Sequence, residues 1–433
     1  MQTNFSLAQL ADAQTAEAEQ ILRSCVHCGF CTATCPTYVL LGDELDSPRG
    51  RIYLIKNMLE AGAAASAEVV RHVDRCLSCL SCMTTCPSGV HYMHLVDHAR
   101  AHIERTYRRP LPERLLRWML ALVLPRPGLF RLSLQAARIA RPFAGLFPGR
   151  LKTLFAMAPE RLPAADGADR PRVIPAEGPR RRRVALMTGC AQRVLDPEIN
   201  AATVRLLTRL GCEVVIADGA GCCGALTHHM GHEEDARTRA RANVAAWRRE
   251  LDGEGLDAVV INASGCGTTV KDYGHLLAQD PDWSEPAARV GALARDVSEV
   301  IEDLGLPDTA DGEGLTVAYH SACSLQHGQK IKTLPSDLLK RAGFQVAAVP
   351  EGHLCCGSAG TYNLLQPAIA ERLRQRKQAN IDSTGAGLVA AGNIGCMTQL
   401  ARDSERPVLH TVQLLDWATG GPRPERLPGA GES

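Results

Sequence analysis

Eight cysteines near the N-terminus have the residue type and the spacing best suited to chemistry. Residues 25–36 are CVHCGFCTATCP and residues 76–87 are CLSCLSCMTTCP, so both follow the spacing C-x2-C-x2-C-x3-C-P. Two-residue gaps let three thiolates converge on a soft metal from one tight loop, whereas the fourth cysteine, followed by proline, leaves that loop. The two segments therefore predict metal centres held by thiolates from both copies.

The same spacing indicates the kind of metal centre. This run binds 4Fe–4S clusters in bacterial two-cluster ferredoxins, where the fourth cysteine of each run ligates the other cluster. Zinc ribbons use two C-x2-C pairs and require neither a third cysteine nor a repeated Cys-Pro. We therefore predict two 4Fe–4S clusters, which carry single electrons. The cross-over assigns Cys25, Cys28, Cys31 and Cys86 to the first cluster, and Cys76, Cys79, Cys82 and Cys35 to the second.

The overall composition is that of a globular protein with room for two or three domains. The chain has 433 residues, of which 45% are hydrophobic, and 48 Lys and Arg balance 47 Asp and Glu. We expect no nucleic-acid partner, because no recognised nucleic-acid module accompanies the balanced charge. The first twenty residues contain no Lys or Arg, so we expect no secretory signal and a cytoplasmic location, where patterned cysteines are more often metal ligands than disulfides. No stretch predicts a membrane span.

The two cysteine segments belong to a module that we place at residues 1–104 and expect to be mostly helical. Between them, apolar residues recur at helical spacing over residues 52–59. Arg49 and Arg51, at the start of this predicted helix, have two interpretations. They hydrogen-bond near a cluster and raise its potential, or they face solvent.

A basic segment with a linker follows at residues 105–183. Residues 105–152 contain eleven Lys or Arg and one acidic residue, Glu113, with apolar residues between them. This pattern predicts short amphipathic helices, broken at Pro125, Pro127, Pro142 and Pro148. They would lie on an anionic membrane surface or on an acidic partner, or would cover the N-terminal module with their Arg side chains in solvent. Residues 159–183 are rich in Pro, Gly and Arg, and we expect a linker there.

The C-terminal half contains one unit twice. Three cysteines recur at an offset of 133 residues, each adjacent Cys-Cys pair is followed by glycine, and each unit ends in a further cysteine. The repeated cysteines are Cys190, Cys222, Cys223 and Cys266 in the first unit, and Cys323, Cys355, Cys356 and Cys396 in the second. Cys212 lies outside the repeat, and we expect it in the core.

Each unit alternates strands and helices. RVALMTGC, CEVVIAD and LDAVVINASGC predict strands in the first unit, with helical patterns between them. This alternation predicts two α/β domains with parallel sheets, at residues 184–300 and 314–418. The repeated cysteines then follow strands, and the carboxyl ends of parallel strands share the edge where ligands bind. We therefore expect the four thiols of each unit to converge.

The repeated units resemble the cysteine-rich CCG domain, which occurs twice in heterodisulfide reductase subunits and in several iron–sulfur dehydrogenase subunits. The full family pattern has another cysteine three positions after the last one, where this chain has Thr269 and Gln399. This departure argues against a noncubane double cluster. A four-thiolate cluster in each repeat and a metal-free repeat stay open as alternatives. Four histidines near the cysteine loops are expected to be satisfied loop residues or proton carriers: His228, His229, His327 and His353.

Signs of substrate chemistry are absent from the sequence. No glycine-rich dinucleotide motif follows a predicted strand, and no group of carboxylates or histidines suggests substrate oxidation. We therefore expect no catalytic residue on this chain. A chain with two clusters and no two-electron cofactor is best interpreted as one subunit of a larger oxidoreductase.

Longer segments resemble one family over residues 20–415. They include CVHCGFCTATCPTYVLLGDELDSPRGRIYLIK, RCLSCLSCMTTCPSGV, ASGCGTTVKDYG and HLCCGSAGTYNL, and they are similar to the iron–sulfur subunit of bacterial glycolate oxidase (glycolate dehydrogenase). Ser321 departs from the family, in which we expect a cysteine, and this argues against an essential ligand at that position.

The resemblance implies a complex in which other chains carry the substrate chemistry. Its expected partners are an FAD-containing subunit that oxidises glycolate to glyoxylate, a second FAD-binding-like subunit, and a quinone or other electron acceptor. It implies a place in the cytoplasm or at the cytoplasmic face of the inner membrane. Two alternatives stay open: a subunit of anaerobic glycerol-3-phosphate or lactate dehydrogenase, and a heterodisulfide-reductase-like thiol/disulfide reductase subunit.

Overall fold

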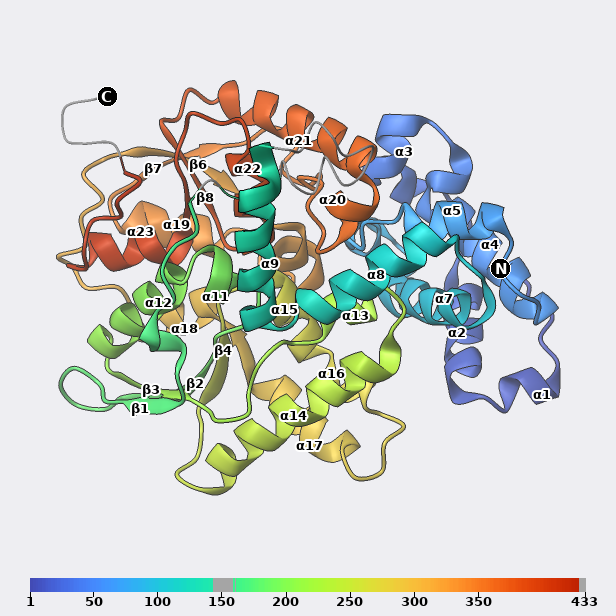
Figure 1. Cartoon of the computed structure of the whole chain (residues 1–433), viewed down its shortest axis with the longest axis horizontal. Helices are drawn as coiled ribbons and strands as arrows, with labels where there is room; N and C mark the ends of the chain where they lie inside the picture. The colour runs from blue at the N-terminus through green and yellow to red at the C-terminus, as the bar shows by residue number, and fades with distance from the viewer. Residues whose placement is uncertain (143–158, 160, 428–433) are drawn as a thin grey trace.

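The computed structural model describes residues 1–142, 159 and 161–427. Along the chain, a helical module comes first, a pair of helices follows, and two α/β domains complete the described part (Figure 1). The helical module lies beside the α/β domains, with α3 next to α21. The predicted break at Pro148 and the rest of the basic segment to residue 152 lie outside the described residues.

The N-terminal module is built from helices alone in its described residues. Its core is formed by apolar faces of the longer helices, including the fully buried Leu22, Ile55, Leu95 and Ile103. The helix predicted over residues 52–59 is confirmed as α4. The elements are α1 (Leu7–Leu10), α2 (Ala13–Ser24), η1 (Phe30–Thr32), α3 (Pro36–Leu41), η2 (Glu44–Asp46), α4 (Pro48–Ala61), α5 (Ala67–Asp74), α6 (Ser81–Thr85) and α7 (Tyr92–Thr106).

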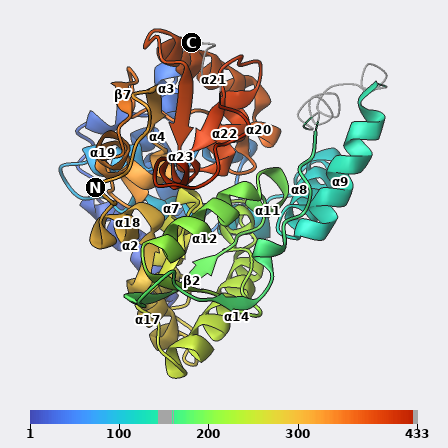
Figure 2. The same ribbon diagram turned by 90° about the vertical axis from the view of Figure 1, so that its left-hand side faces the viewer.

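Two amphipathic helices, α8 (Leu111–Val123) and α9 (Pro127–Ala140), follow as the sequence predicted. The start of α8 is fixed to the N-terminal module, because Arg109 and Arg117 pair with Asp74 of α5 at 3.1 and 3.0 Å. The two helices form an outer edge of the molecule, from which α9 projects (Figure 2). Part of the basic segment thus covers the N-terminal module, while another part is exposed.

The first α/β domain contains a five-stranded sheet in the order β1-β3-β2-β4-β5. The three strands predicted from the sequence are β2 (Arg182–Met187), β3 (Cys212–Ile216) and β4 (Ala258–Ile261), and they are parallel. Two short strands were not predicted: β5 (Ala294–Asp296) and β1 (Arg172–Ile174), which lies in the expected linker and pairs antiparallel with β3. The helices are α11 (Gln192–Leu195), α12 (Glu198–Arg209), α13 (Ala225–His228), α14 (Glu233–Asp252), α15 (Ser264–Lys271), α16 (Tyr273–Leu276), α17 (Ser284–Leu293) and α18 (Val297–Leu304).

The second α/β domain repeats this topology with four parallel strands in the order β7-β6-β8-β9. Its strands are β6 (Thr316–His320), β7 (Gln345–Ala348), β8 (Leu388–Ala391) and β9 (Val408–His410). The other elements are the π-helical turn η5 (Ser324–Gly328) and the helices α19 (Leu334–Arg341), α20 (Tyr362–Leu365), α21 (Pro367–Asp382), α22 (Ile394–Ala401) and α23 (Thr411–Ala418). The predicted fold class, a helical module followed by two parallel-sheet α/β domains, is confirmed.

The two α/β domains share one hydrophobic core. Helices α12 and α23 pack together, and apolar side chains such as Leu207 and Leu414 are fully buried between the sheets. At the rim, Arg209 donates to the buried carboxylate of Asp416 at 3.1 Å. Because each fully buried aliphatic side chain contributes about 1.5–3 kcal/mol, this shared core fixes the two cysteine-bearing sheet edges relative to each other.

Candidate iron–sulfur centres

The two N-terminal cysteine loops share an unusual backbone. Positive φ angles occur at His27 (57°) and Gly29 (85°) in the first loop, and at Ser78 (50°) and Leu80 (62°) in the second, at equivalent positions of the two motifs. This left-handed conformation costs a non-glycine residue roughly 1–2 kcal/mol. Because Ser78 and Leu80 are not glycines, the sequence did not indicate positive φ angles at these two positions. The strain is stored where the chain must curl so that successive cysteines face the same point.

The first group of cysteines lines one cavity. Its walls contain Cys25, Cys28, Cys31 and Cys86, together with Cys82 of the second motif and the apolar side chain of Ile52. Cys25 is buried and Cys28 is exposed, so the group lies close to the surface. Burial raises the pKa of the Cys31 thiol to about 11. A pocket lined by several cysteines suits a metal cluster, because bound metal holds thiols in their deprotonated form. The ligand assignment itself stays a prediction.

The second group is buried. Cys35, Cys76, Cys79 and Cys82 are each exposed by less than a tenth. Burial, together with neighbouring thiols, raises the pKa of Cys79 and of Cys82 well above the usual value. The Ser78 amide lies 3.4 Å from Cys76 Sγ, and the Tyr92 hydroxyl donates to the same sulfur at 3.8 Å. Donors aimed at sulfur stabilise thiolate, so these residues also fit the predicted cluster.

Arg51 is a buried cation beside this second group. Its side chain is 1% exposed, and Nη1 lies 3.8 Å from Cys35 Sγ. The other guanidinium nitrogens donate to the His72 carbonyl at 2.7 Å and to Thr37 Oγ1 at 2.9 Å. Burial alone would lower its pKa, but nearby Cys76, Tyr92, Cys35 and Asp46 raise it. The interpretation of Arg51 as a solvent-facing residue is wrong.

Arg49 has a different environment. Its side chain is 33% exposed and pairs with Glu44 at 2.8 Å, and its Nη1 lies 3.4 Å from the His27 carbonyl of the first cysteine loop. The guanidinium also occupies the space that a side chain at Gly29 would need, with 2.8 Å between Nη1 and an added Cβ. Arg49 therefore supports the first loop from its outer side.

The repeated cysteines form two further groups of four. In the first repeat, side-chain contacts link Cys190 to Cys222, Cys222 to Cys223, and Cys223 to Cys266. In the second repeat, Cys323 Sγ lies 3.8 Å from Cys355 Sγ, and contacts continue from Cys355 to Cys356 and on to Cys396. Cys190 and the Cys-Cys pairs lie in loops near strand ends, whereas Cys266 and Cys396 lie in the helices that follow β4 and β8.

The glycine after each Cys-Cys pair is required by the backbone. Gly224 and Gly357 have φ angles of 89° and 88°. A Cβ at these positions would lie 3.0 Å from the Ala236 carbonyl oxygen and 2.5 Å from the Ala370 carbonyl oxygen. Only glycine therefore permits the turn that brings the adjacent cysteines against the following helix.

The positions without the additional family cysteine have other contacts. Thr269 Oγ1 donates to the Gly265 carbonyl of its own helix at 3.3 Å. Gln399 is fully buried and accepts from the Asn363 amide at 3.1 Å. Neither side chain supplies a sulfur donor. Cys212 is fully buried in the shared hydrophobic core, as expected.

The four histidines singled out from the sequence lie mainly at contacts between modules. His228 and His229 face the buried carboxylate of Asp97 on α7 at 3.4 and 3.3 Å. His327 Nδ1 lies 2.7 Å from Thr84 Oγ1 of α6, and its Nε2 lies 3.2 Å from the His353 carbonyl. Three of the four, His228, His229 and His327, therefore contact side chains of the N-terminal module.

Sequence reasoning missed two polar residues near the thiols of the second repeat, His320 and Lys377. Both are 2% exposed. A comparison of the two repeats could have indicated them. At the positions 133 residues earlier, the first repeat has the apolar residues Met187 and Val244, so a polar residue at these positions is particular to the second repeat.

Comparisons with known proteins define the class of this chain. The model of the 4Fe–4S dicluster domain matches residues 24–90. The model of the cysteine-rich domain matches twice, at residues 184–271 and 317–401. The protein is therefore an iron–sulfur protein in which a dicluster module precedes a duplicated cysteine-rich domain.

Two relatives match almost the whole chain. The glycolate oxidase iron-sulfur subunit of Escherichia coli (strain K12) is 44% identical, over 96% of this chain and 99% of its own length. The probable glycolate oxidase iron-sulfur subunit of Bacillus subtilis (strain 168) is 34% identical, over 92% of this chain and 94% of its own. The chain belongs to the family of glycolate oxidase iron–sulfur subunits.

Two more distant likenesses fit the same layout. Lactate utilization protein A of Bacillus subtilis (strain 168) is 26% identical over 54% of this chain and 99% of its own length. Among solved structures, the crystal structure of a hypothetical protein from Helicobacter pylori aligns with a TM-score of 0.54 at 11% identity, covering 95% of this chain and 73% of that chain. This second likeness concerns the fold alone.

The cross-over assignment of the cysteines can be tested with paired substitutions. Cys35→Ser should damage the cluster built mainly from Cys76, Cys79 and Cys82, so the reconstituted variant should lose about four of about eight irons. Adding Cys76→Ser should remove no further iron, whereas adding Cys25→Ser should remove nearly all of it. Iron analysis and EPR of the reduced variants measure this. The reverse pattern of the two double variants would show that each motif binds its own cluster.

The contribution of Arg51 can be measured as a reduction potential. Arg51→Met removes a buried positive charge beside Cys35, and should lower the potential of one cluster by on the order of 100 mV, the Coulomb effect expected at an effective dielectric constant of about 20. Arg51→Lys should restore most of the potential, because it keeps the charge. Arg71→Met on α5 is the matched control, since Arg71 is exposed. Equal potentials in Arg51→Met and the control would contradict the assigned role.

Proposed function

We propose that this chain is the electron-transfer subunit of a flavin-dependent glycolate dehydrogenase complex. The observation that carries the proposal is the arrangement of two groups of four cysteines, one near the surface and one buried, in a chain of this family. Bound 4Fe–4S clusters would supply one-electron carriers at these two positions. Substrate oxidation would take place on a partner subunit with FAD, and electrons would leave towards a quinone or another acceptor.

The surface around the first group suits an electron-donating partner. Cys28 is exposed, and beside it Val26, Phe30 and Tyr53 expose 67%, 62% and 51% of their surface. Exposed apolar side chains of this size next to a redox site favour a docking protein, because a partner removes them from water. We infer that an FAD-containing subunit docks here and excludes water from the first group of cysteines.

Residues around the second group control its environment. Arg51 supplies a fixed positive charge, Tyr92 and the Ser78 amide donate to sulfur, and Leu77 excludes water. Hydrogen bonds, charge and burial are the means by which a protein sets a cluster potential. The chain itself would not turn over substrate, since its role is to hold and tune carriers.

Lactate oxidation is the second candidate. It is favoured by the likeness to lactate utilization protein A, which spans 54% of this chain. The glycolate oxidase subunits match over more than nine tenths of the chain and at higher identity, so we place glycolate first.

Purification with partners tests the proposed function. An affinity-tagged chain, isolated anaerobically from its own host, should carry an FAD-containing subunit, and the complex should reduce a redox dye when glycolate is added. The chain alone, with about eight irons, should show no glycolate-dependent reduction. Val26→Asp with Phe30→Asp should lower dye reduction at least tenfold at full iron content. A complex that is reduced by glycerol 3-phosphate or lactate and not by glycolate would overturn the assignment.

We also propose that α8 and α9 lie against an anionic membrane surface. In the described part of the chain, no helix is long and apolar enough to cross a membrane. The large apolar side chains that these two helices expose are Leu111, Leu115, Trp118, Met119, Leu129, Leu132 and Ile139. Arg114, Arg126 and Arg138 are exposed among them. Exposed apolar side chains flanked by basic residues favour an anionic lipid interface over a neutral surface.

Vesicle binding tests the membrane proposal. Trp118→Glu with Leu115→Glu should weaken binding of the reconstituted chain to vesicles with anionic lipids at least tenfold, because two large apolar side chains no longer enter the interface. Raised salt should weaken binding of the unsubstituted chain. Leu7→Glu is the control, since Leu7 is 89% exposed on the N-terminal module. Unchanged co-sedimentation of the double variant, or no binding by the unsubstituted chain, would contradict the proposal.

A further inference from the structure

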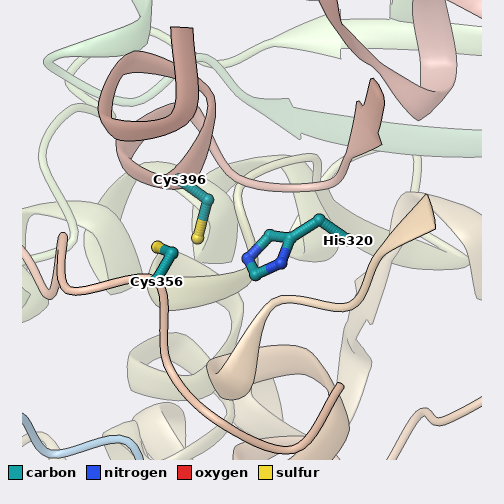
Figure 3. A group of neighbouring side chains, drawn as sticks. All are labelled: His320, Cys356 and Cys396. Atoms are coloured by element: carbon teal, nitrogen blue, oxygen red, sulfur yellow. The ribbon is translucent and has the colours of Figure 1, made fainter. Parts of the chain in front are cut away.

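Three side chains of the second repeat converge on one buried point. His320 ends β6, Cys356 belongs to the Cys-Cys pair, and Cys396 lies in α22; Figure 3 shows the three side chains close together. One nitrogen of the imidazole and the two sulfur atoms all lie within 4.8 Å of each other. The residues are exposed by 2%, 1% and 5%, so water does not reach this point freely.

The imidazole of His320 has a ring nitrogen without a hydrogen-bond partner among the described residues. Its Nε2 atom is buried and has no hydrogen bond to any described residue. A buried polar atom without a partner costs about 1–3 kcal/mol. Such a cost is offset when a metal ion accepts the nitrogen lone pair, and imidazole and thiolate together are the ligands that zinc prefers.

The remaining thiols of the repeat extend this group. Cys323 Sγ lies 3.8 Å from Cys355 Sγ, and side-chain contacts connect Cys355 to Cys356 and Cys356 to Cys396. A tetrahedral ion with Zn–S bonds of about 2.3 Å places its sulfur ligands about 3.8 Å apart. A cubane cluster, in contrast, attaches each thiolate to a different iron and holds the sulfurs farther apart. The Cys323–Cys355 spacing is therefore shorter than a cubane cluster requires.

A buried cation lies beside these thiols. Lys377 of α21 is 2% exposed, and its ammonium donates to the Glu351 carbonyl at 2.7 Å. The groups that face it are Cys355, Cys356 and Cys396, and the carboxylate of Glu351, which itself pairs with Arg376. A divalent ion with three thiolates and one neutral imidazole has a net charge of −1. The ammonium offsets that charge without water.

The first repeat lacks both polar residues. At the corresponding positions, it has Met187 and Val244, which are buried in the apolar core of that repeat. Its four thiols therefore have neither an imidazole ligand nor a buried ammonium from these positions. The difference separates the two repeats although they share a strand order.

We propose that the second repeat binds a single thiophilic metal ion, zinc by preference, through His320 Nε2 and the thiolates of Cys356 and Cys396. Cys323 or Cys355 supplies the fourth ligand. This site is separate from the two clusters of the N-terminal module and has no redox step of its own. Cys355 packs with Leu77 and Cys79 of the N-terminal module in one apolar cluster. The ion would therefore stiffen the wall behind the second group of N-terminal cysteines.

Metal analysis of the full-length chain tests this site. The chain, purified anaerobically with its two clusters loaded, should contain about eight irons and one zinc. His320→Met introduces the residue of the first repeat, and should lower zinc affinity at least tenfold while about eight irons are retained. Lys377→Met keeps every ligand and should weaken zinc binding less. Cys212→Ala, which changes a buried cysteine away from the site, should keep the zinc.

Cobalt provides a readout that does not depend on activity. Replacing zinc with Co²⁺ in the apo-chain should give intense thiolate-to-cobalt absorption, which Cys356→Ser and Cys396→Ser should weaken, and Cys212→Ala should not. A count of about nine irons that falls to about eight in His320→Met would support the site with iron as its ion, whereas about twelve irons would indicate a further cluster and overturn the single-ion proposal. A chain with no metal beyond the clusters, a disulfide between Cys323 and Cys355 in the purified chain, or His320→Met with unchanged metal content would overturn the proposal.

Discussion

The fold depends on keeping clustered thiols inside a protein interior, where negative charge is costly. Sixteen of the seventeen cysteines fall into four groups of four, and burial raises the pKa of thiols such as Cys79 and Cys82. Two kinds of partner meet this constraint. Backbone amides and hydroxyls donate to sulfur, and buried cations lie beside two of the groups. Arg51 and Lys377 in turn need acceptors, which are the His72 and Glu351 carbonyls.

The same constraint joins the modules. The second N-terminal group lies where the helical module meets the second repeat, so that Cys79 and Cys355 share one apolar cluster. Around it, Thr84 contacts His327 at 2.7 Å, and the Tyr362 hydroxyl donates to the Arg75 carbonyl at 3.0 Å. The repeat therefore supplies part of the wall that keeps water from this group. In contrast, the first group reaches the surface at Cys28, and the two groups are suited to different neighbours.

Local patterns in the sequence predicted much of this arrangement. The cysteine spacing, the helical period of α4 and the apolar runs of β2, β3 and β4 each depend on residues close in sequence. What was missed depends on distant contacts or on very short elements. Strands β1 and β5 have three residues each, too few to show alternation. The burial of Arg51 results from packing against Asp46 and His72, and neighbouring residues in the sequence do not reveal it.

The two repeats differ in the polarity of two buried positions, Met187 and Val244 in the first and His320 and Lys377 in the second. A core tolerates histidine or lysine in place of methionine or valine only where their polar atoms have partners, because an unpaired buried charge is costly. The first repeat has the apolar pair, and contributes α12 to the core shared with α23. The second repeat has the polar pair, and it is also the repeat whose cysteines touch the N-terminal module. His320 and Lys377 thus place polar groups beside thiols that adjoin the buried N-terminal cysteines, where a fixed charge influences the electron carrier most directly.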